Sequence, residues 1–384
     1  MHYKFLIYIS YSYALPIGTP LEKEILSRGD TVMWFSDLDN TKTALQGKNN
    51  VLDTIKSVVN YEPDIVLAAT NDVPDFISGL KVQIFHGFNA QKRPEGNNKF
   101  AHFRLRGFFD LYCTQGPSTT SVFKLLQEKH QYFEVKETGW SKVDPLFPIV
   151  EQEKNSLPTI MIASTFSKRL SLALHNDVFK TIQQLATSGK YNFIMVLHPK
   201  LPSEIKDKWK SLNSNHFTYY DTTDLAPLFK KADIMFADTT SAIQEFLLQQ
   251  KPVVTYRHTF NHDYLINIED ANAIESAFDE ALNYPEKLLT NIDTFINQLH
   301  PYFDGKSSKR VVEACISFLH DDKSHLKNKP LNLIRKYKIR KRLGYFTLKS
   351  YSKPYTLKNN LILFNTILGI SRFLSLSMLP NLLV

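Results

Sequence analysis

Two histidines in this sequence directly follow apolar runs that are typical of β-strands. His86 comes after the run 81–85, and His198 comes after the run 192–197. Ligands bind at the carboxyl ends of the strands in a parallel sheet, and histidine, with an ordinary pKa of roughly 6.5, can act there as a base or as a cation. One histidine at a strand end is more often a structural polar residue. The matched pair favours catalysis, with both side chains lining one cleft.

A cluster of hydroxyl and carboxyl side chains follows another predicted strand, 233–237. The cluster consists of Asp238, Thr239, Thr240, Ser241 and Glu245. The three hydroxyls open a predicted helix, whose first turn has free backbone N–H groups and the positive end of the helix dipole. The glutamate lies one turn further along and can reach a ligand hydroxyl. The pattern predicts a phosphate cradle, although the same residue types also form ordinary helix caps.

Basic side chains gather at two further places. Lys306 and Arg310 flank the paired serines 307–308 at a second predicted helix start, where they could hold phosphate; a capped surface helix explains this spacing equally well. The loop after His86 has basic residues on both sides, which suits an anionic acceptor. Its candidate acceptor-side residues are Gly87, Asn89 and Arg93, with Lys92, Arg104 and Arg106 nearby.

The sequence does not predict a metal site or a cofactor. His258 and His262 have a spacing that binds metal on a helix, but they lie in a probable loop with Asp263 as the only acidic neighbour. The Asp-Leu-Asp stretch at 37–39 is too short to establish a metal-binding motif. The glycine-rich motifs of P-loop kinases and dinucleotide enzymes are missing, which argues against both classes.

Two series of short apolar runs, alternating with stretches of helix length, must position these residues. The first series lies between residues 3 and 138, and the second lies between residues 159 and 256. Because strands that alternate with helices form parallel sheets, the pattern predicts an α/β chain with two Rossmann-like domains facing across a cleft. The Pro-containing stretch 144–158 is the predicted boundary. We expect an N-terminal domain at 1–150, a C-terminal domain with the phosphate cradle at 151–320, and a tail at 321–384.

Charge is distributed unevenly along the chain. The 384 residues include 46 Lys/Arg and 38 Asp/Glu, and the tail from 321 onward holds 13 of the basic residues but only 2 of the acidic ones. The basic stretch 335–342, followed by the interrupted apolar stretch 361–383, fits a helix that lies on an anionic membrane surface. With two cysteines and no recognisable signal peptide, we expect a cytoplasmic protein, peripheral at the inner face of the cell membrane.

The ordered set of motifs resembles the CDP-glycerol glycerophosphotransferases of teichoic-acid and capsule synthesis. The matching stretches are HGFN at 86–89, RGFFDLYCTQGPS at 106–118, TGWSKVDPLF at 138–147, ASTFS at 163–167, LHPK at 197–200, DLAPLFKKADIMFADTTSAIQEFLLQQKPVVTY at 224–256 and DGKSSKRVVE at 304–313. The resemblance implies a GT-B-like fold in which the C-terminal domain holds most of the CDP donor. It also implies that His86 and His198 are essential, and that Thr240 and Ser241 hold the donor phosphate.

The reaction implied by this resemblance transfers glycerol phosphate, or a similar alditol phosphate, from a CDP-linked donor to a hydroxyl of a cell-surface polymer precursor, and it releases CMP. The implied partners are the CDP-alditol, a lipid-linked or polysaccharide acceptor and the membrane surface, without a cofactor or nucleic acid. A glycosyltransferase that uses a nucleotide sugar and a nucleotide-sugar 2-epimerase fit the same fold. A nucleic-acid-binding protein would explain the basic tail, but not a near-neutral body with paired histidines.

Overall fold

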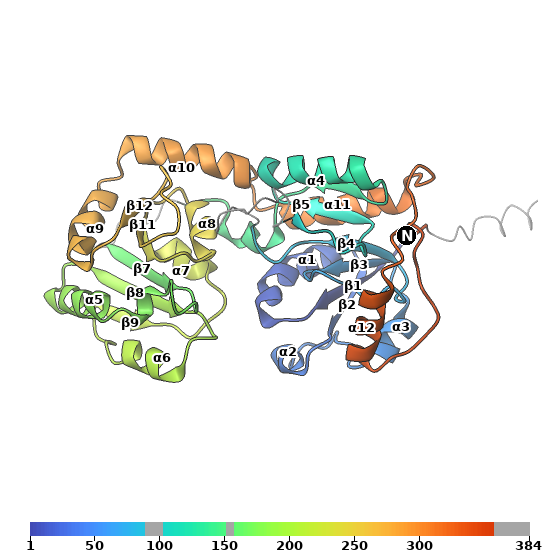
Figure 1. The fold of residues 1–384 in the computed structure, drawn as a ribbon, viewed down its shortest axis with the longest axis horizontal. Coiled ribbons are helices and arrows are strands. Elements are labelled where there is room, and N and C mark those ends of the chain that lie inside the picture. Colours follow the sequence, from blue (N-terminus) through green and yellow to red (C-terminus); the bar gives the residue numbers. More distant parts are fainter. Residues whose placement is uncertain (89–102, 151–156, 357–384) are drawn as a thin grey trace, which may run out of the picture.

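The computed structural model describes residues 1–88, 103–150 and 157–356, which form two α/β domains side by side (Figure 1). The first part of the chain contains β1 (Lys4–Ile9), α1 (Leu15–Ser27), β2 (Thr31–Ser36), α2 (Asp39–Ala44), α3 (Ile55–Tyr61), β3 (Ile65–Ala68), β4 (Leu80–Gln83), β5 (Leu111–Thr114), α4 (Pro117–His130) and β6 (Glu134–Glu137). The second part contains β7 (Thr159–Ser164), α5 (Asn176–Ser188), β8 (Asn192–Leu197), α6 (Ser203–Lys210), β9 (Phe217–Tyr219), α7 (Ala226–Lys231), β10 (Ile234–Ala237), α8 (Ala242–Leu247), β11 (Val253–Tyr256), β12 (Ile266–Ile268), α9 (Ile274–Leu282) and α10 (Glu286–Leu299). They are followed by α11 (Ser307–His320) and α12 (Leu333–Leu343).

Each domain is built around a six-stranded parallel sheet. The strand order is β2-β1-β3-β4-β5-β6 in the first sheet and β12-β11-β10-β7-β8-β9 in the second. Central strands such as β3 are buried on both faces, which explains why they read as continuous apolar runs. The predicted pair of parallel α/β domains is therefore confirmed. β12 is not predicted by the sequence pattern, because this strand has only three residues, all half-buried, at the edge of its sheet.

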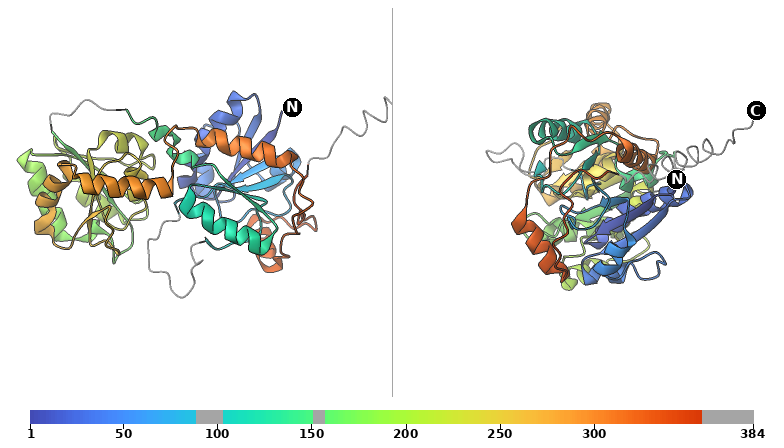
Figure 2. Two further views of the ribbon diagram at one scale, coloured as in Figure 1. Left: turned by 90° about the horizontal axis from the view of Figure 1, so that it is seen from above. Right: turned by 90° about the vertical axis from the view of Figure 1, so that its right-hand side faces the viewer.

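Helices cover both faces of the first sheet. α11 packs beside α1 on one face, where Val312 and Cys315 are buried, and α4 lies on the other face, where Phe123 and Leu126 are buried (Figure 2). α10 runs from the second domain to α4, and the chain then returns to the first domain. The range 151–320 predicted for the C-terminal domain thus contains one helix, α11, that packs on the first sheet.

The basic segment after α11 also lies against the first domain. Ile339 of α12 is buried among residues of the first sheet, and Arg340 forms an ion pair of 2.6 Å with Asp75. Lys329 pairs with the fully buried Asp110 at 2.6 Å. Within the described ranges, we find no helix that is both long enough and apolar enough to cross a membrane. The predicted apolar stretch 361–383 lies outside the described residues.

Candidate active site at the domain junction

The carboxyl ends of both sheets face the junction between the domains. A small cavity of about 10 Å³ at this junction is lined by side chains that follow strands of each sheet. Pro16 and Lys142 come from the first domain, after β1 and β6, while Asp224 and Glu245 come from the second domain, after β9 and β10. Side chains that follow strands of both sheets therefore meet at the junction, while His86, His198 and the turn 239–241 do not line this small cavity.

His86 lies on an anchored turn directly after β4. Phe85 adopts a positive φ of 54°, which turns the chain out of the strand, and Phe88 returns to the core against Trp140, with ring centroids 4.8 Å apart. The imidazole is exposed, and its centroid lies 6.0 Å from the ring of Tyr13, which follows β1. The fold thus fixes the backbone on both sides of His86 and keeps the ring on the surface.

The other candidates on the acceptor side follow His86 directly. The carbonyl oxygen of Gly87 accepts a hydrogen bond of 3.0 Å from Nε2 of Gln115, a residue that follows β5. This bond ties the turn after β4 to the neighbouring strand end. Asn89 and Arg93 lie outside the described residues, so their part in the site stays a prediction.

His198 follows β8 in the second sheet and is half-buried. Its ring packs against Phe166, with centroids 4.5 Å apart, and its Nδ1 accepts a hydrogen bond of 3.1 Å from the backbone N–H of Lys200. The neutral ring therefore carries its proton on Nε2 and can donate it to a ligand oxygen. Burial lowers the pKa of His198, and the charges of Lys200 and Lys206 lower it further.

Asp238 organises the second domain beneath the predicted phosphate cradle. Its fully buried carboxylate accepts hydrogen bonds from Oγ of Ser164 at 2.6 Å, from the N–H of Thr165 at 3.0 Å and from the N–H of Leu172 at 3.0 Å. Burial raises the pKa of Asp238 to about 6, although these hydrogen bonds favour the charged form. We infer that Asp238 shapes the loop after β7, since its oxygens are already used by the protein.

The three hydroxyls after Asp238 form the turn that leads into α8. Oγ1 of Thr239 accepts a hydrogen bond from the N–H of Thr259 at 3.3 Å, and Oγ1 of Thr240 accepts one from the N–H of Ala242 at 3.4 Å. Thr240 and Ser241 are both half-buried. The turn therefore brings two partly accessible hydroxyls to the carboxyl edge of the second sheet.

Glu245 joins the two domains through an ion pair. Its Oε1 lies 2.7 Å from Nζ of Lys142, and the side chains are only 9% and 18% exposed. The ammonium group of Lys142 also lies 5.3 Å from the ring centroid of Trp140. The sequence analysis assigned Glu245 to a ligand hydroxyl, and the structure gives it a partner across the junction.

The start of α11 is capped from the first domain. Asp144 accepts hydrogen bonds from the N–H of Ser307 at 2.8 Å, from the N–H of Ser308 at 2.7 Å and from Oγ of Ser308 at 2.6 Å. Burial raises the pKa of Asp144. Lys306 is the residue before the helix, and its N–H donates to Asp304 at 3.0 Å. A phosphate at this helix start would have to displace Asp144.

Arg310 is held by three interactions within the protein. Its guanidinium contacts both carboxylate oxygens of Asp304, at 2.8 and 3.0 Å, and its Nε donates to the carbonyl of Thr138 at 2.9 Å. The guanidinium carbon also lies 4.1 Å from the ring centroid of Tyr302. This geometry favours a role in joining α11 to the strand end after β6, and the predicted contact of Arg310 with donor phosphate stays a prediction.

The sequence analysis missed one buried histidine at the junction, His300. Its Nε2 accepts a hydrogen bond of 3.0 Å from the N–H of Trp140, and burial lowers its pKa to about 4. His300 follows a helix and not a strand, so it does not share the strand-end position of the two predicted histidines. A repeated Leu-His-Pro sequence, at 197–199 and 299–301, was the available signal.

The two histidines with metal-binding spacing follow β11. In the part of the chain that the structure describes, no group of three His, Cys, Asp or Glu side chains is arranged to hold a metal ion. His258 and His262 do lie close together after β11, with ring centroids 5.4 Å apart.

Known proteins share this architecture. The family model described as UDP-N-acetylglucosamine 2-epimerase matches residues 113–316. A structure of a variant of the wall teichoic acid polymerase TagF has a TM-score of 0.58 at 12% identity and covers 82% of this chain and 88% of that chain. The UDP-GlcNAc 2-epimerase from Neisseria meningitidis bound to UDP-GlcNAc has a TM-score of 0.56 at 16% identity, covering 82% and 100%. A putative UDP-N-acetylglucosamine 2-epimerase from Listeria monocytogenes has a TM-score of 0.55 at 16% identity, covering 83% and 96%. No curated protein matches the sequence.

The solved structures show that the fold is the two-domain GT-B-like fold. Their low identities do not separate a transferase from an epimerase, so the resemblance to glycerophosphotransferases is confirmed only as far as this fold. The family model covers just over half of the chain and includes His198 and the turn 239–241, while His86 lies before its start. The chain therefore belongs to the UDP-N-acetylglucosamine 2-epimerase family.

Proposed function

We propose that this protein transfers an alditol phosphate from a CDP-linked donor to a hydroxyl of a cell-surface polymer precursor. The observation that carries the proposal is that each of the two facing sheet edges presents a histidine, His86 or His198, and that the second edge adds the hydroxyl-bearing turn 239–241. Phosphoryl transfer requires an aligned nucleophile, a base for its proton and donors for the phosphate oxygens. Each requirement has a candidate group at the junction.

The second domain supplies the donor side of this reaction. Nε2–H of His198 can donate to a pyrophosphate oxygen, because Nδ1 already accepts a backbone N–H. The half-buried hydroxyls of Thr240 and Ser241 add two further donors at the same sheet edge. Together these groups can stabilise the negative charge that develops on the phosphate oxygens and on the departing CMP.

The first domain supplies the base. The imidazole of His86 takes the proton from the acceptor hydroxyl while the hydroxyl oxygen forms a bond to the β-phosphorus of the donor. The bond from that phosphorus to the bridging oxygen breaks, and its electron pair leaves with CMP. The exposed position of His86 suits this role, since an acceptor has to reach it from solvent.

Replacement of the histidines tests these roles. His86→Ala and His198→Ala should each lower turnover by roughly 10²- to 10⁴-fold, the usual contribution of a positioned acid or base. His325→Ala is the matched control. This histidine lies on the segment after α11, is exposed and pairs with Glu134 of β6. Folded variants of His86 or His198 that keep near-wild-type turnover would rule out the assignment.

Family membership favours a second candidate, a nucleotide-sugar 2-epimerase, and the fold also admits a glycosyltransferase. An epimerase needs groups that remove and return a proton on the sugar ring. The carboxylates of Glu245 and Asp144 at the junction are engaged by Lys142 and by the start of α11, which supports transfer over epimerisation.

A single assay separates the three activities. The purified protein is incubated with CDP-glycerol, CDP-ribitol or UDP-GlcNAc, with and without a hydroxyl-bearing acceptor, and the nucleotide and sugar products are measured. Acceptor-dependent release of CMP is the result that we expect. Acceptor-dependent release of UDP would indicate a glycosyltransferase, and conversion of UDP-GlcNAc to its 2-epimer without an acceptor would indicate an epimerase.

The described part of the tail supports contact with a membrane surface that carries the acceptor. Six large apolar side chains on this segment are exposed: Leu331, Leu333, Ile334, Tyr337, Phe346 and Leu348. Lys338 and Lys341 are also exposed on α12, and no acidic residue follows Asp322 in the sequence. Apolar side chains beside cations fit the interface of an anionic bilayer.

Co-sedimentation with vesicles tests this contact. Full-length protein should sediment with phosphatidylglycerol vesicles and be released by high salt, because charged residues near an anionic surface are screened. The double variant Leu333→Ser, Ile334→Ser should sediment less. Both side chains are exposed, so the substitutions should leave the fold intact. Equal sedimentation with neutral vesicles would contradict the proposal.

A further inference from the structure

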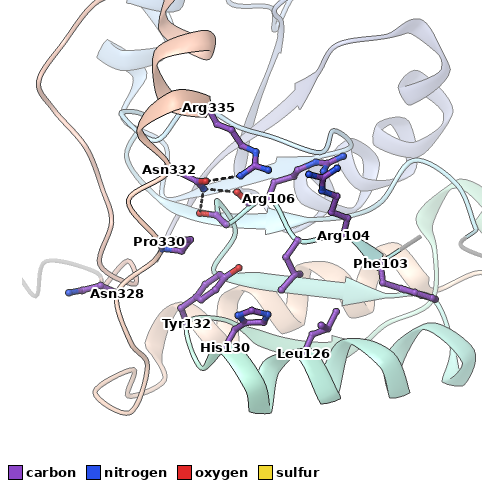
Figure 3. Close-up of a pocket in the computed structure, with 12 residues that line it drawn as sticks. Phe103, Arg104, Arg106, Leu126, His130, Tyr132, Asn328, Pro330, Asn332 and Arg335 are labelled. Atoms are coloured by element: carbon purple, nitrogen blue, oxygen red, sulfur yellow. Dashed lines mark hydrogen bonds between the residues drawn. The ribbon is translucent and has the colours of Figure 1, made fainter. Parts of the chain in front are cut away.

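A pocket of about 530 Å³ lies on the first domain, away from the junction (Figure 3). Its wall consists of residues 103–107 ahead of β5, the end of α4 with Tyr132, and residues from 328 to 335 at the start of α12. These segments lie at the amino ends of β5 and β6, whereas the candidate active site lies at the carboxyl ends of the strands. The volume falls within the range of small-molecule sites, roughly 300–1,000 Å³.

Three arginines, Arg104, Arg106 and Arg335, lie together on one side of this pocket (Figure 3). None of the 12 described residues that line the pocket is acidic. Burial lowers the pKa of Arg106, and the charges of Arg104 and Arg335 lower it further, while Asp72 acts in the opposite direction. Like charges held close together in a partly buried site repel one another, so a bound anion would stabilise this arrangement.

Packing between two distant segments of the chain holds the backbone at Arg106 and the side chain of Arg335. Nδ2 of Asn332 donates to the carbonyl oxygens of Arg106 at 2.6 Å and of Gly107 at 3.3 Å, and its Oδ1 accepts a hydrogen bond of 2.9 Å from Arg335. Gly107 has a φ of 77°, and a Cβ at this position would lie 2.5 Å from Pro330. Only glycine allows this close approach. This wall of the pocket is therefore formed by tightly packed backbone segments and not by loose side chains.

The other side of the pocket is largely apolar. Phe103, Leu105, Leu126 and Tyr132 line it, and the last two are buried. Burial raises the pKa of Tyr132 to about 12, so its hydroxyl keeps its proton at neutral pH and can donate a hydrogen bond. A ligand that fits both sides needs an anionic head and an apolar body.

We propose that this pocket binds a phosphate monoester or diphosphate ester whose organic part is apolar. Guanidinium groups form paired, charge-assisted hydrogen bonds with phosphate oxygens, and three of them more than balance the charge of about −2 on a phosphate monoester. The ester comes either from solution or from the headgroup of a lipid, and both sources present the same chemistry. The site is separate from the junction, so the proposal does not depend on the reaction proposed above.

Calorimetric titration of the full-length protein tests the site with soluble probes. Inorganic phosphate and octyl phosphate are the probes, and octyl phosphate should bind about tenfold tighter or more because its chain can contact the apolar side. The double variant Arg104→Gln, Arg106→Gln should weaken octyl phosphate binding by about tenfold or more. It leaves the Asn332–Arg335 hydrogen bond in place and should keep or raise the melting temperature.

The control variant removes the same charge outside the pocket. Lys338→Gln with Lys341→Gln changes two exposed residues of α12 and should alter octyl phosphate binding by less than about twofold. Equal losses in the two double variants would show a general effect of surface charge and would overturn the proposal. If the Arg104→Gln, Arg106→Gln protein loses its fold, the single variant Arg104→Gln, at an exposed position, replaces it.

Vesicles identify the source of the ester. Phosphatidic acid carries a phosphate monoester, whereas phosphatidylglycerol carries a diester, so the two vesicle types separate the headgroup from the surface charge. A loss of binding to phosphatidic acid alone in the Arg104→Gln, Arg106→Gln variant would assign the pocket to a lipid headgroup. Binding of octyl phosphate with no such loss would assign it to a soluble ester. The proposal would be refuted if the Arg104→Gln, Arg106→Gln variant bound octyl phosphate and phosphatidic acid vesicles as the wild type does.

Discussion

The starts of α8 and α11 carry similar residues but differ in what contacts them. Each follows an aspartate and presents paired hydroxyls, so both read as phosphate sites in the sequence. At α11, Asp144 of the first domain accepts the N–H groups of Ser307 and Ser308 at 2.8 and 2.7 Å. The protein itself thus supplies the anion that this helix start prefers.

The turn before α8 has a different environment. Asp238 is directed to the loop after β7, where it accepts from Ser164 and Thr165, and among the described residues no carboxylate hydrogen-bonds to the hydroxyls of Thr240 and Ser241. A helix start is thus a candidate ligand site only when the fold does not supply its own acceptor. We therefore propose that the donor phosphate binds at Thr240 and Ser241. The start of α11 instead serves packing within the first domain, because α11 lies on the first sheet and Asp144 belongs to the same domain.

The largest effect is expected from removing the internal anion at α11. Asp144→Ala should lower the free energy of unfolding by about 3–5 kcal/mol, because it leaves three donors of Ser307 and Ser308 without their buried acceptor. Urea-induced unfolding measures this loss. Asp39→Ala, at an exposed position, is the control and should barely change the midpoint. A loss below about 1 kcal/mol would show that Asp144 does not cap α11.

Removing the hydroxyls at the other helix start should affect ligand binding more than folding. The double variant Thr240→Ala, Ser241→Ala should weaken binding of the CDP-alditol by about 3 kcal/mol, roughly a hundredfold, because each hydroxyl donates to a charged group. Calorimetric titration with CDP-glycerol gives the affinity, and the melting temperature reports folding. Unchanged affinity would move the donor phosphate away from this turn.

Lowering the pH should reduce the free energy of unfolding through His300, which precedes α11. Its folded pKa of about 4 lies below the ordinary value of roughly 6.5, so the fold favours the neutral ring. The stability that His300 contributes is complete above pH about 6.5 and is lost as the pH falls toward about 4, a total of about 2–3 kcal/mol. Urea unfolding across this range should show the loss.

Comparison of the wild type with a His300 variant separates the contribution of His300 to stability from those of Asp144 and Asp238. Asp144 and Asp238 have raised pKa values, so their contributions increase as the pH falls. His300→Gln keeps an acceptor for the N–H of Trp140 but cannot titrate. The difference in the free energy of unfolding between wild type and variant should therefore report the protonation of His300 alone. A difference that does not change with pH would contradict the low pKa of His300.

The smallest effect is expected from the ion pair beside α11. Asp304→Asn should cost less than about 1 kcal/mol, because Asp304 is 47% exposed and the Thr138 carbonyl and the Tyr302 ring still hold Arg310. Affinity for CDP-glycerol should stay the same. A change in that affinity would show that Arg310 contacts the donor, as the sequence analysis predicted.

The apolar pattern of the sequence was sufficient to predict the two parallel sheets and to place both histidines after strands. Buried parallel strands must be apolar along their whole length, so runs such as 65–68 and 234–237 could be recognised without the fold. The carboxyl end of each run then located His86 and His198, because strand direction follows from the βα alternation.

Contacts between distant segments determine which helix start is capped by a carboxylate and where the basic tail lies. Asp144 and Ser307 are 163 residues apart, and no local pattern predicts that one caps the other. The same holds for Arg340 with Asp75, and for the pocket that Arg104 and Arg106 form with Arg335. Local sequence specifies secondary structure through periodicity and caps, whereas the pairing of buried charges depends on which segments pack together.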